Sequence, residues 1–283
     1  MAYVRARGVR FHVVDLGRDT GRAPVVMLHG LFTGSAASWF FTVAPALART
    51  RRVRLPDWRG HGLTERTPTG YDTATMADDL AALTADLPPF AIAGHSYGAT
   101  VAVRFARAHP GRATALALVD PPFANTATDR HPNAPSHGLP DARHHAEAGA
   151  PGHEVPDVHR HAGAGAPSRG IPDARGHVEA DIYRHAVPEA RREAVAELLR
   201  RTSLRADLAA EPPVTAAELA ELAGLPVLAV VGSESPFRAA GDLVGRALPA
   251  ARRHVLTGGH DLHITARARL TPLLGAFLEE AHA

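Results

Sequence analysis

The segment from Phe90 to Val103, FAIAGHSYGATVAV, changes within a few residues from a strand-like apolar pattern to a helix-like one. It reads G-x-S-x-G from Gly94 to Gly98, with Ser96 at its centre. A turn this tight leaves no room for side chains at the glycine positions, and it lifts the serine oxygen clear of the sheet. The helix that follows directs its unpaired N–H groups toward the same place. The segment therefore predicts a reactive serine between a buried strand and a helix.

The remaining sequence alternates short apolar runs with amphipathic helical patterns. Alternation of this kind predicts a mostly parallel, twisted sheet that is covered by helices on both faces. Residues 3–17 are typical of a β-hairpin, and the expected strands that follow are 23–30, 51–58, 89–94, 113–120, 225–232 and 251–258. The expected helices are 35–50, 72–87, 97–110, 237–249 and 265–281.

The alternation stops between residues 121 and 225, where a repeat with a period of 16 residues occupies the region 135–180. The repeat is rich in Pro, Gly, Ala and His, and it has too few large apolar residues to form a core of its own. Its histidines fall in phase at His145, His161 and His177. Two interpretations remain open here, a passive low-complexity expansion and a histidine-rich tract that binds a metal ion. After the repeat, residues 187–203 and 215–224 are predicted to form amphipathic helices.

Composition excludes several classes of function. The sequence has no cysteine, which rules out disulfides, zinc–thiolate sites and cysteine nucleophiles. The 31 basic residues are all arginine and are interspersed with 29 acidic ones, so no basic stripe for nucleic acid is expected. No segment has the length and apolar character of a signal peptide or a membrane span. We therefore expect a cytoplasmic protein with no cofactor, no metal site, and neither a nucleic-acid nor a membrane partner.

Four motifs occur in an order that resembles the α/β-hydrolase fold superfamily, in its branch with a serine nucleophile and an inserted cap. They are LHGLFTG at 28–34, DWRGHGLT at 57–64, GHSYGA at 94–99 and GGHDLH at 258–263. The resemblance covers residues 3–120 and 226–281. It implies a core formed by residues 1–120 and 226–283, with residues 121–225 inserted as a helical cap.

The resemblance implies roles for particular residues. Ser96 matches the nucleophile, and His260 matches the general base that takes its proton and returns it to the leaving group. Backbone N–H groups of Leu31 and Tyr97 match the oxyanion hole. The other histidines of these motifs are weaker candidates for the base: His29, His61, His95 and His263.

The third member of the implied triad departs from the family pattern. The acid usually follows the strand after the cap, but this chain reads VVGSESPF there and has Ser235 at the matching position. A serine cannot stabilise an imidazolium ion as a carboxylate does. Asp120 ends the strand before the cap, a position that lipases and thioesterases of the family also use for the acid. Glu234 is the alternative acid, adjacent to Ser235.

The resemblance favours a serine hydrolase that cleaves an ester, lactone or thioester of a small molecule through an acyl-enzyme. A serine at position 96 argues against epoxide hydrolases and dehalogenases, whose nucleophile at this turn is aspartate. One alternative is a non-hydrolytic enzyme of the same fold, such as a lyase or cyclase, with Ser96 and His260 as acid and base. Another is a ligand-binding protein without catalytic activity.

Overall fold

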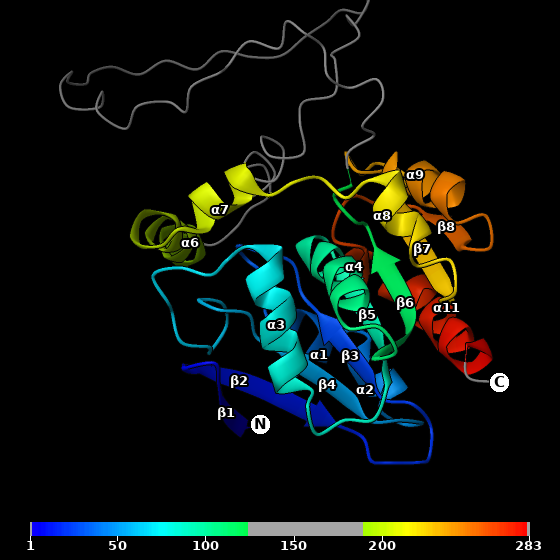
Figure 1. Ribbon diagram of the computed structural model, residues 1–283, viewed down its shortest axis with the longest axis horizontal. Helices are drawn as coiled ribbons and strands as arrows, with labels where there is room; N and C mark the ends of the chain where they lie inside the picture. Colours follow the sequence, from blue (N-terminus) through cyan, green and yellow to red (C-terminus); the bar gives the residue numbers. More distant parts are fainter. Residues whose placement is uncertain (1, 124–188, 282–283) are drawn as a thin grey trace, which may run out of the picture.

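The strands form one eight-stranded sheet in the order β1-β2-β4-β3-β5-β6-β7-β8, as seen in a computed structural model that describes residues 2–123 and 189–281 (Figure 1). The strand bounds are β1 Ala2–Ala6, β2 Val9–Leu16, β3 Val25–Leu28, β4 Val53–Pro56, β5 Phe90–His95, β6 Ala113–Val119, β7 Val227–Gly232 and β8 Arg252–Leu256. Strands β1 and β2 are the predicted hairpin, and they pair antiparallel with each other and with β4. All other neighbours are parallel.

The central strands are apolar because both faces of the sheet are covered. Strands β3, β5 and β7 are buried along their whole length. One face packs against α3 (Thr73–Leu83), α4 (Tyr97–Ala108) and α9 (Ala240–Ala247). The other packs against α1 (Ala36–Phe40), α2 (Ala44–Leu47), α10 (Leu262–Thr265) and α11 (Arg267–Glu280). The expected fold class, a mostly parallel sheet with helices on both faces, is thereby confirmed.

Two expected helices differ from their predicted extent. The segment 35–50 forms two short helices instead of one, because α1 ends at Phe40 and α2 begins only at Ala44, with a proline in its first turn. The last helix begins at Arg267, and the short helix α10 occupies the preceding residues. None of the helices in residues 2–123 and 189–281 combines the length and the apolar character that crossing a membrane requires.

The chain between β6 and β7 contains α6 (Glu189–Arg201), α7 (Leu204–Ala210) and α8 (Ala216–Ala220). Two carboxylates fasten this region to the start of α3. Asp207 accepts a hydrogen bond from the backbone N–H of Tyr71 at 2.9 Å. Glu211 accepts from the N–H of Thr73 at 3.0 Å and from its hydroxyl at 2.5 Å. These contacts hold α7 beyond the carboxyl ends of the parallel strands (Figure 1). The predicted repeat at 135–180 lies outside the described residues.

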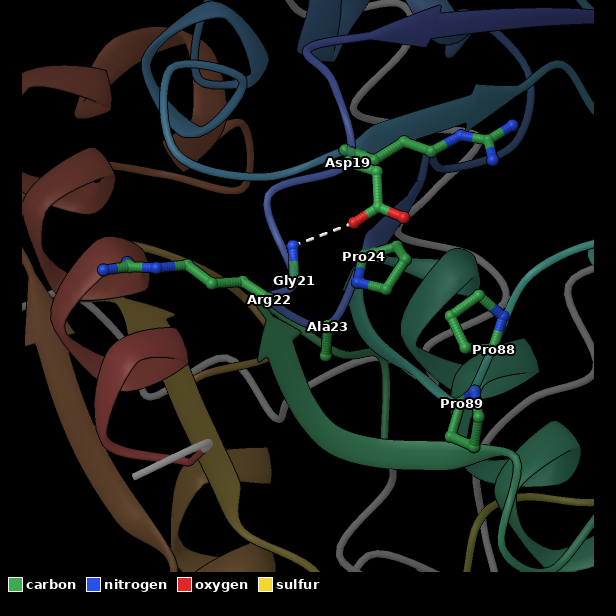
Figure 2. A pocket seen from close by; sticks show the side chains of 8 residues that line it. Asp19, Gly21, Arg22, Ala23, Pro24, Pro88 and Pro89 are labelled. Atoms are coloured by element: carbon green, nitrogen blue, oxygen red, sulfur yellow. Dashed lines mark hydrogen bonds between the residues drawn. The ribbon is translucent and has the colours of Figure 1, made fainter.

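A shallow hollow lies at the opposite edge of the sheet, beside the amino ends of β3, β4 and β5 (Figure 2). Within the lining of this hollow, the side chain of Asp19 accepts a hydrogen bond from the N–H of Gly21 at 2.9 Å. Its lining comprises Asp19, Gly21, Arg22, Ala23, Pro24, Arg52, Pro88 and Pro89. The motifs identified in the sequence all follow the carboxyl ends of strands, so this hollow is remote from them.

We expect Gly98→Ala to destabilise the protein and Gly275→Ala to stabilise it. A Cβ on Gly98 would lie 2.7 Å from the carbonyl oxygen of Leu28, which is backbone and has no rotamer to change. Overpacking of this kind costs about 1–3 kcal/mol. A Cβ on Gly275 meets nothing within 4 Å, so the same substitution inside α11 gains about 0.5–1 kcal/mol from helix propensity. Thermal unfolding followed by circular dichroism measures both, and equal shifts of the two midpoints would contradict the packing argument.

Candidate active site

Ser96 lies at the sharp turn that joins β5 to α4. Its backbone has φ 52° and ψ −126°, a conformation that L-residues rarely adopt, and its side chain is almost fully buried. The flanking glycines allow this turn, since a Cβ on Gly94 would lie 2.5 Å from the carbonyl oxygen of Gly98. Such a strained residue persists only where its surroundings fix it. The predicted strand–turn–helix around Ser96 is therefore present in the structure.

The loop that follows β3 borders the serine side chain. A Cβ on Gly30 would lie 3.1 Å from the Cβ of Ser96 and 3.5 Å from its Oγ. Leu31 follows Gly30 directly, and Tyr97 follows Ser96 as the first residue of α4. A first-turn N–H has no acceptor within its own helix. The two residues expected to form the oxyanion hole therefore both lie near Ser96.

Two buried histidines fix the shape of this loop. His29 Nε2 accepts a hydrogen bond from the backbone N–H of Trp58 at 3.1 Å, and His61 Nε2 accepts from the N–H of Phe32 at 2.9 Å. The other nitrogen of each ring contacts a backbone carbonyl 2.7 Å away and donates to it. One acceptor and one donor per ring is the pattern of neutral imidazole. Burial lowers the pKa of His29, and it lowers the pKa of His61 to about 3.

His260 contacts one of the two candidate carboxylates. Its Nδ1 lies 2.6 Å from Oδ2 of Asp120, which is fully buried at the end of β6. Glu234, the alternative acid, is exposed to solvent. The structure thus brings Asp120 and His260 together across 140 residues of sequence, whereas Glu234 is exposed.

Ser235 contacts the same carboxylate. Its hydroxyl donates to Oδ2 of Asp120 at 2.5 Å, and the backbone N–H of Gly232 donates to Oδ1 at 2.8 Å. The hydroxyl of Ser235 also accepts from the N–H of Phe237 at 3.0 Å, which fixes its orientation. Three donors around one carboxylate compensate for the burial of its charge. The sequence indicated only that Ser235 replaces an expected acid, not that it would bind one.

His95 connects the Ser96 turn to the segment that carries His260. Its Nε2 lies 3.0 Å from the backbone carbonyl oxygen of His260, and the two ring centroids are 4.7 Å apart. Phe237 packs against His260 with its ring centroid at 5.0 Å. Burial, and then the neighbouring His260, lower the pKa of His95 to about 4. His95 is therefore neutral near pH 7 and donates its Nε2 proton to the carbonyl of His260.

Comparisons with known proteins agree with this architecture. A family model described as alpha/beta hydrolase fold matches residues 23–152. The non-heme chloroperoxidase of Streptomyces lividans is 39% identical over 137 residues, which are 47% of this chain and 48% of that protein. A soluble epoxide hydrolase from a Corynebacterium species is 39% identical over 103 residues, 35% of this chain and 34% of that enzyme. The matched segment spans less than half the length of either curated relative.

Among solved structures, a variant of the meta-cleavage product hydrolase CumD superposes with a TM-score of 0.67. It covers 99% of this chain and 98% of its own, at 19% sequence identity. At this identity the likeness shows a shared fold and not a shared substrate.

We expect Asp120→Asn to slow the reaction of Ser96 with a fluorophosphonate by about 10³- to 10⁴-fold, because a neutral amide holds the wrong tautomer of His260 and cannot stabilise the imidazolium ion. Glu234→Gln is the matched control and should leave the labelling rate unchanged, since Glu234 is exposed. The rate is measured by intact mass against time. Fast labelling of Asp120→Asn together with slow labelling of Glu234→Gln would assign the acid to Glu234.

The buried neutral histidines predict a loss of stability in acid. The folded-state pKa of His61, about 3, lies below the ordinary value of 6.5. Between these values the unfolded chain binds a proton that the folded chain does not, so the free energy of unfolding falls as the pH decreases. His61→Gln keeps an acceptor for the N–H of Phe32 but does not titrate. We expect urea unfolding midpoints of this variant to fall less steeply from pH 7 to pH 4 than those of the wild type. An equally steep fall of the midpoints in both proteins would show that His61 does not contribute to the loss of stability in acid.

Proposed function

We propose that this chain, which belongs to the α/β-hydrolase fold superfamily, hydrolyses an ester, lactone or thioester of a small molecule through an acyl-enzyme on Ser96. The observation that supports this most directly is the contact of 2.6 Å between Asp120 and His260. A carboxylate on Nδ1 leaves Nε2 of the imidazole as the proton acceptor, which is the state that a general base for a serine hydroxyl requires.

In the proposed mechanism, His260 Nε2 takes the hydroxyl proton of Ser96 as Oγ attacks the carbonyl carbon. The electron pair of the carbonyl π bond moves to its oxygen, and the N–H groups of Leu31 and Tyr97 stabilise the oxyanion. When the tetrahedral intermediate collapses, His260 transfers the proton to the leaving alcohol or thiol. Water then repeats the sequence on the acyl-enzyme and releases the acid and free Ser96.

The surroundings of Asp120 support its part in this scheme. The hydroxyl of Ser235 and the N–H of Gly232 fix both carboxylate oxygens, so the Oδ2 that contacts His260 has one orientation. A carboxylate held in place fixes the imidazole tautomer and stabilises the imidazolium ion formed during proton transfer. Asp120 itself does not take up the proton.

The same contact favours hydrolysis over the non-hydrolytic alternative. Ser235 stands where the family usually has its acid, and a missing acid would favour that alternative. Asp120 supplies a carboxylate to His260 from the end of β6 instead. A serine, a histidine and a carboxylate at one edge of the sheet support acyl transfer, whereas a lyase or cyclase needs only an acid and a base. Ser96 in place of aspartate likewise favours an acyl compound over an epoxide as substrate.

The segment 121–225 is the proposed cap over this site, inserted into a core of residues 1–120 and 226–283. Its described part supports this arrangement, since Asp207 and Glu211 fasten it to the start of α3, next to the Ser96 turn. Leu198 of α6 also approaches the loop after β4. Its Cδ1 lies 2.7 Å from the position that a Cβ on Gly60 would occupy. A cap in this position would enclose a small molecule and exclude water from the acyl-enzyme.

We expect incubation with a fluorophosphonate to add one label per chain, and we expect the label to be absent from Ser96→Ala. An activated serine forms a covalent bond to phosphorus and displaces fluoride, whereas ordinary hydroxyls do not react. Ser38→Ala is the matched control, because Ser38 lies in α1 and donates to the carbonyl of Ser35. Intact-mass spectrometry gives the stoichiometry. A label that persists in Ser96→Ala would overturn the assignment of the nucleophile.

A panel of acyl esters, lactones and thioesters then tests the reaction class. Burst release of the first product, equal to the enzyme concentration, would establish the acyl-enzyme. A labelled Ser96 with no turnover of any acyl compound would favour the non-hydrolytic alternative. Tight binding of a small molecule with neither label nor turnover would favour the ligand-binding alternative.

A further inference from the structure

Three side chains that the proposed mechanism does not use meet beside His260. His95 ends β5, Asp261 follows His260, and His263 lies in α10. One potential ligand atom from each of the three lies within 4.8 Å of the others. A metal site could not be expected here from residue spacing, because His95 is more than 160 residues from the other two and only the fold brings them together.

The two imidazoles of the cluster are buried, and its carboxylate faces solvent. His95 is 4% and His263 2% exposed, while the side chain of Asp261 is 61% exposed. The two ring centroids are 4.1 Å apart, and Trp39 packs on His263 with its centroid at 4.9 Å. Nε2 of His95 lies 3.9 Å from Oδ1 of Asp261. Two rigid donors are thus held by packing, and a movable third donor faces solvent, from which an ion would enter.

His263 has a buried nitrogen without a function in the fold. Its Nδ1 has no hydrogen-bond partner among the described residues. A buried polar atom left unpaired destabilises a protein, so natural structures usually provide it with a partner. A buried imidazole nitrogen without a hydrogen-bond partner can offer its lone pair to a ligand.

We propose that His95, Asp261 and His263 bind a divalent transition-metal ion of the zinc class, and that this ion inhibits the hydrolase. Two imidazoles and one carboxylate form a donor set that suits Zn²⁺, with solvent as a fourth ligand. Bonds of about 2.0–2.2 Å in a tetrahedral site place two donors about 3.4 Å apart. The 3.9 Å between His95 Nε2 and Asp261 Oδ1 closes to this value by a small movement of the exposed carboxylate.

The ion inhibits the enzyme because it removes the hydrogen bond that His95 donates to the segment carrying His260. Its Nε2 proton is donated to the carbonyl oxygen of His260, 3.0 Å away. An ion on Nε2 takes the place of that proton, so His95 keeps its single proton on Nδ1 and the bond to His260 breaks. No proton is released, and Asp261 offsets one of the two positive charges. Without this hydrogen bond, the segment that carries His260 is no longer held to the Ser96 turn. The general base then moves away from its position. This consequence, unlike the binding itself, rests on the proposed function.

The binding test uses the full chain, freed of metal with a chelator and then dialysed against ZnCl₂. The sequence contains 18 histidines, so total zinc is less informative than the difference between variants. His263→Gln and Asp261→Asn should each lose one bound ion per chain, or weaken its binding at least about tenfold. His254→Gln and Asp242→Asn are matched controls on exposed side chains of β8 and α9, and they should bind as the wild type does.

Asp261→Asn changes an exposed side chain and keeps the test decisive if His263→Gln fails to fold. Wild-type stoichiometry and affinity in Asp261→Asn would overturn the site. Inhibition is read separately, as the fluorophosphonate labelling rate with and without ZnCl₂. We expect zinc to lower the labelling rate of the wild type and of the control variants but not that of Asp261→Asn. Zinc that binds without slowing the wild type would overturn the inhibition alone. A chain that takes no label without zinc would count against the proposed hydrolase, not against the metal site.

Discussion

The hydrogen bond between Asp120 and His260 depends on the order of the sheet and on nothing local in the sequence. Asp120 directly follows β6 and His260 follows β8, and only β7 separates these strands. Because the strands are parallel, their carboxyl ends meet at one edge, and the turn after β5 that holds Ser96 reaches the same edge. A chain in which β6 and β7 are neighbours can carry a long insertion between them without moving the carboxylate away from the imidazole.

The buried charge of Asp120 explains the residues around it. A carboxylate with no exposed surface is costly unless donors surround it. Its backbone has φ 46°, an unusual value for a residue other than glycine, and its N–H donates to Val230 at 2.7 Å. Ser235 and the N–H of Gly232 donate to its oxygens from the neighbouring strand and turn. A serine in place of an acid at 235 is thus compatible with a carboxylate at 120, whereas a second acid would repel it.

Sequence patterns predicted the sheet, the helices on both faces and the strand–turn–helix at Ser96, because alternation and glycine spacing are local properties. They narrowed the partner of His260 to two residues, Asp120 and Glu234, but did not decide between them. That decision depends on distances between strands that are far apart in the sequence. The break of the expected helix 35–50 was missed for a different reason: its apolar residues keep helical spacing through the turn before Ala44.

The histidines near the Ser96 turn show why residue type alone does not identify a base. His29 and His61 each accept from a backbone N–H and donate to a backbone carbonyl, so neither has a lone pair left for a substrate. His95 donates to the carbonyl of His260 and is buried. Of these rings, His260 alone has its Nδ1 on a carboxylate, and its side chain keeps 15% exposure. Since all of them carry the same group, their different chemistry follows from which of their nitrogens the fold leaves unpaired.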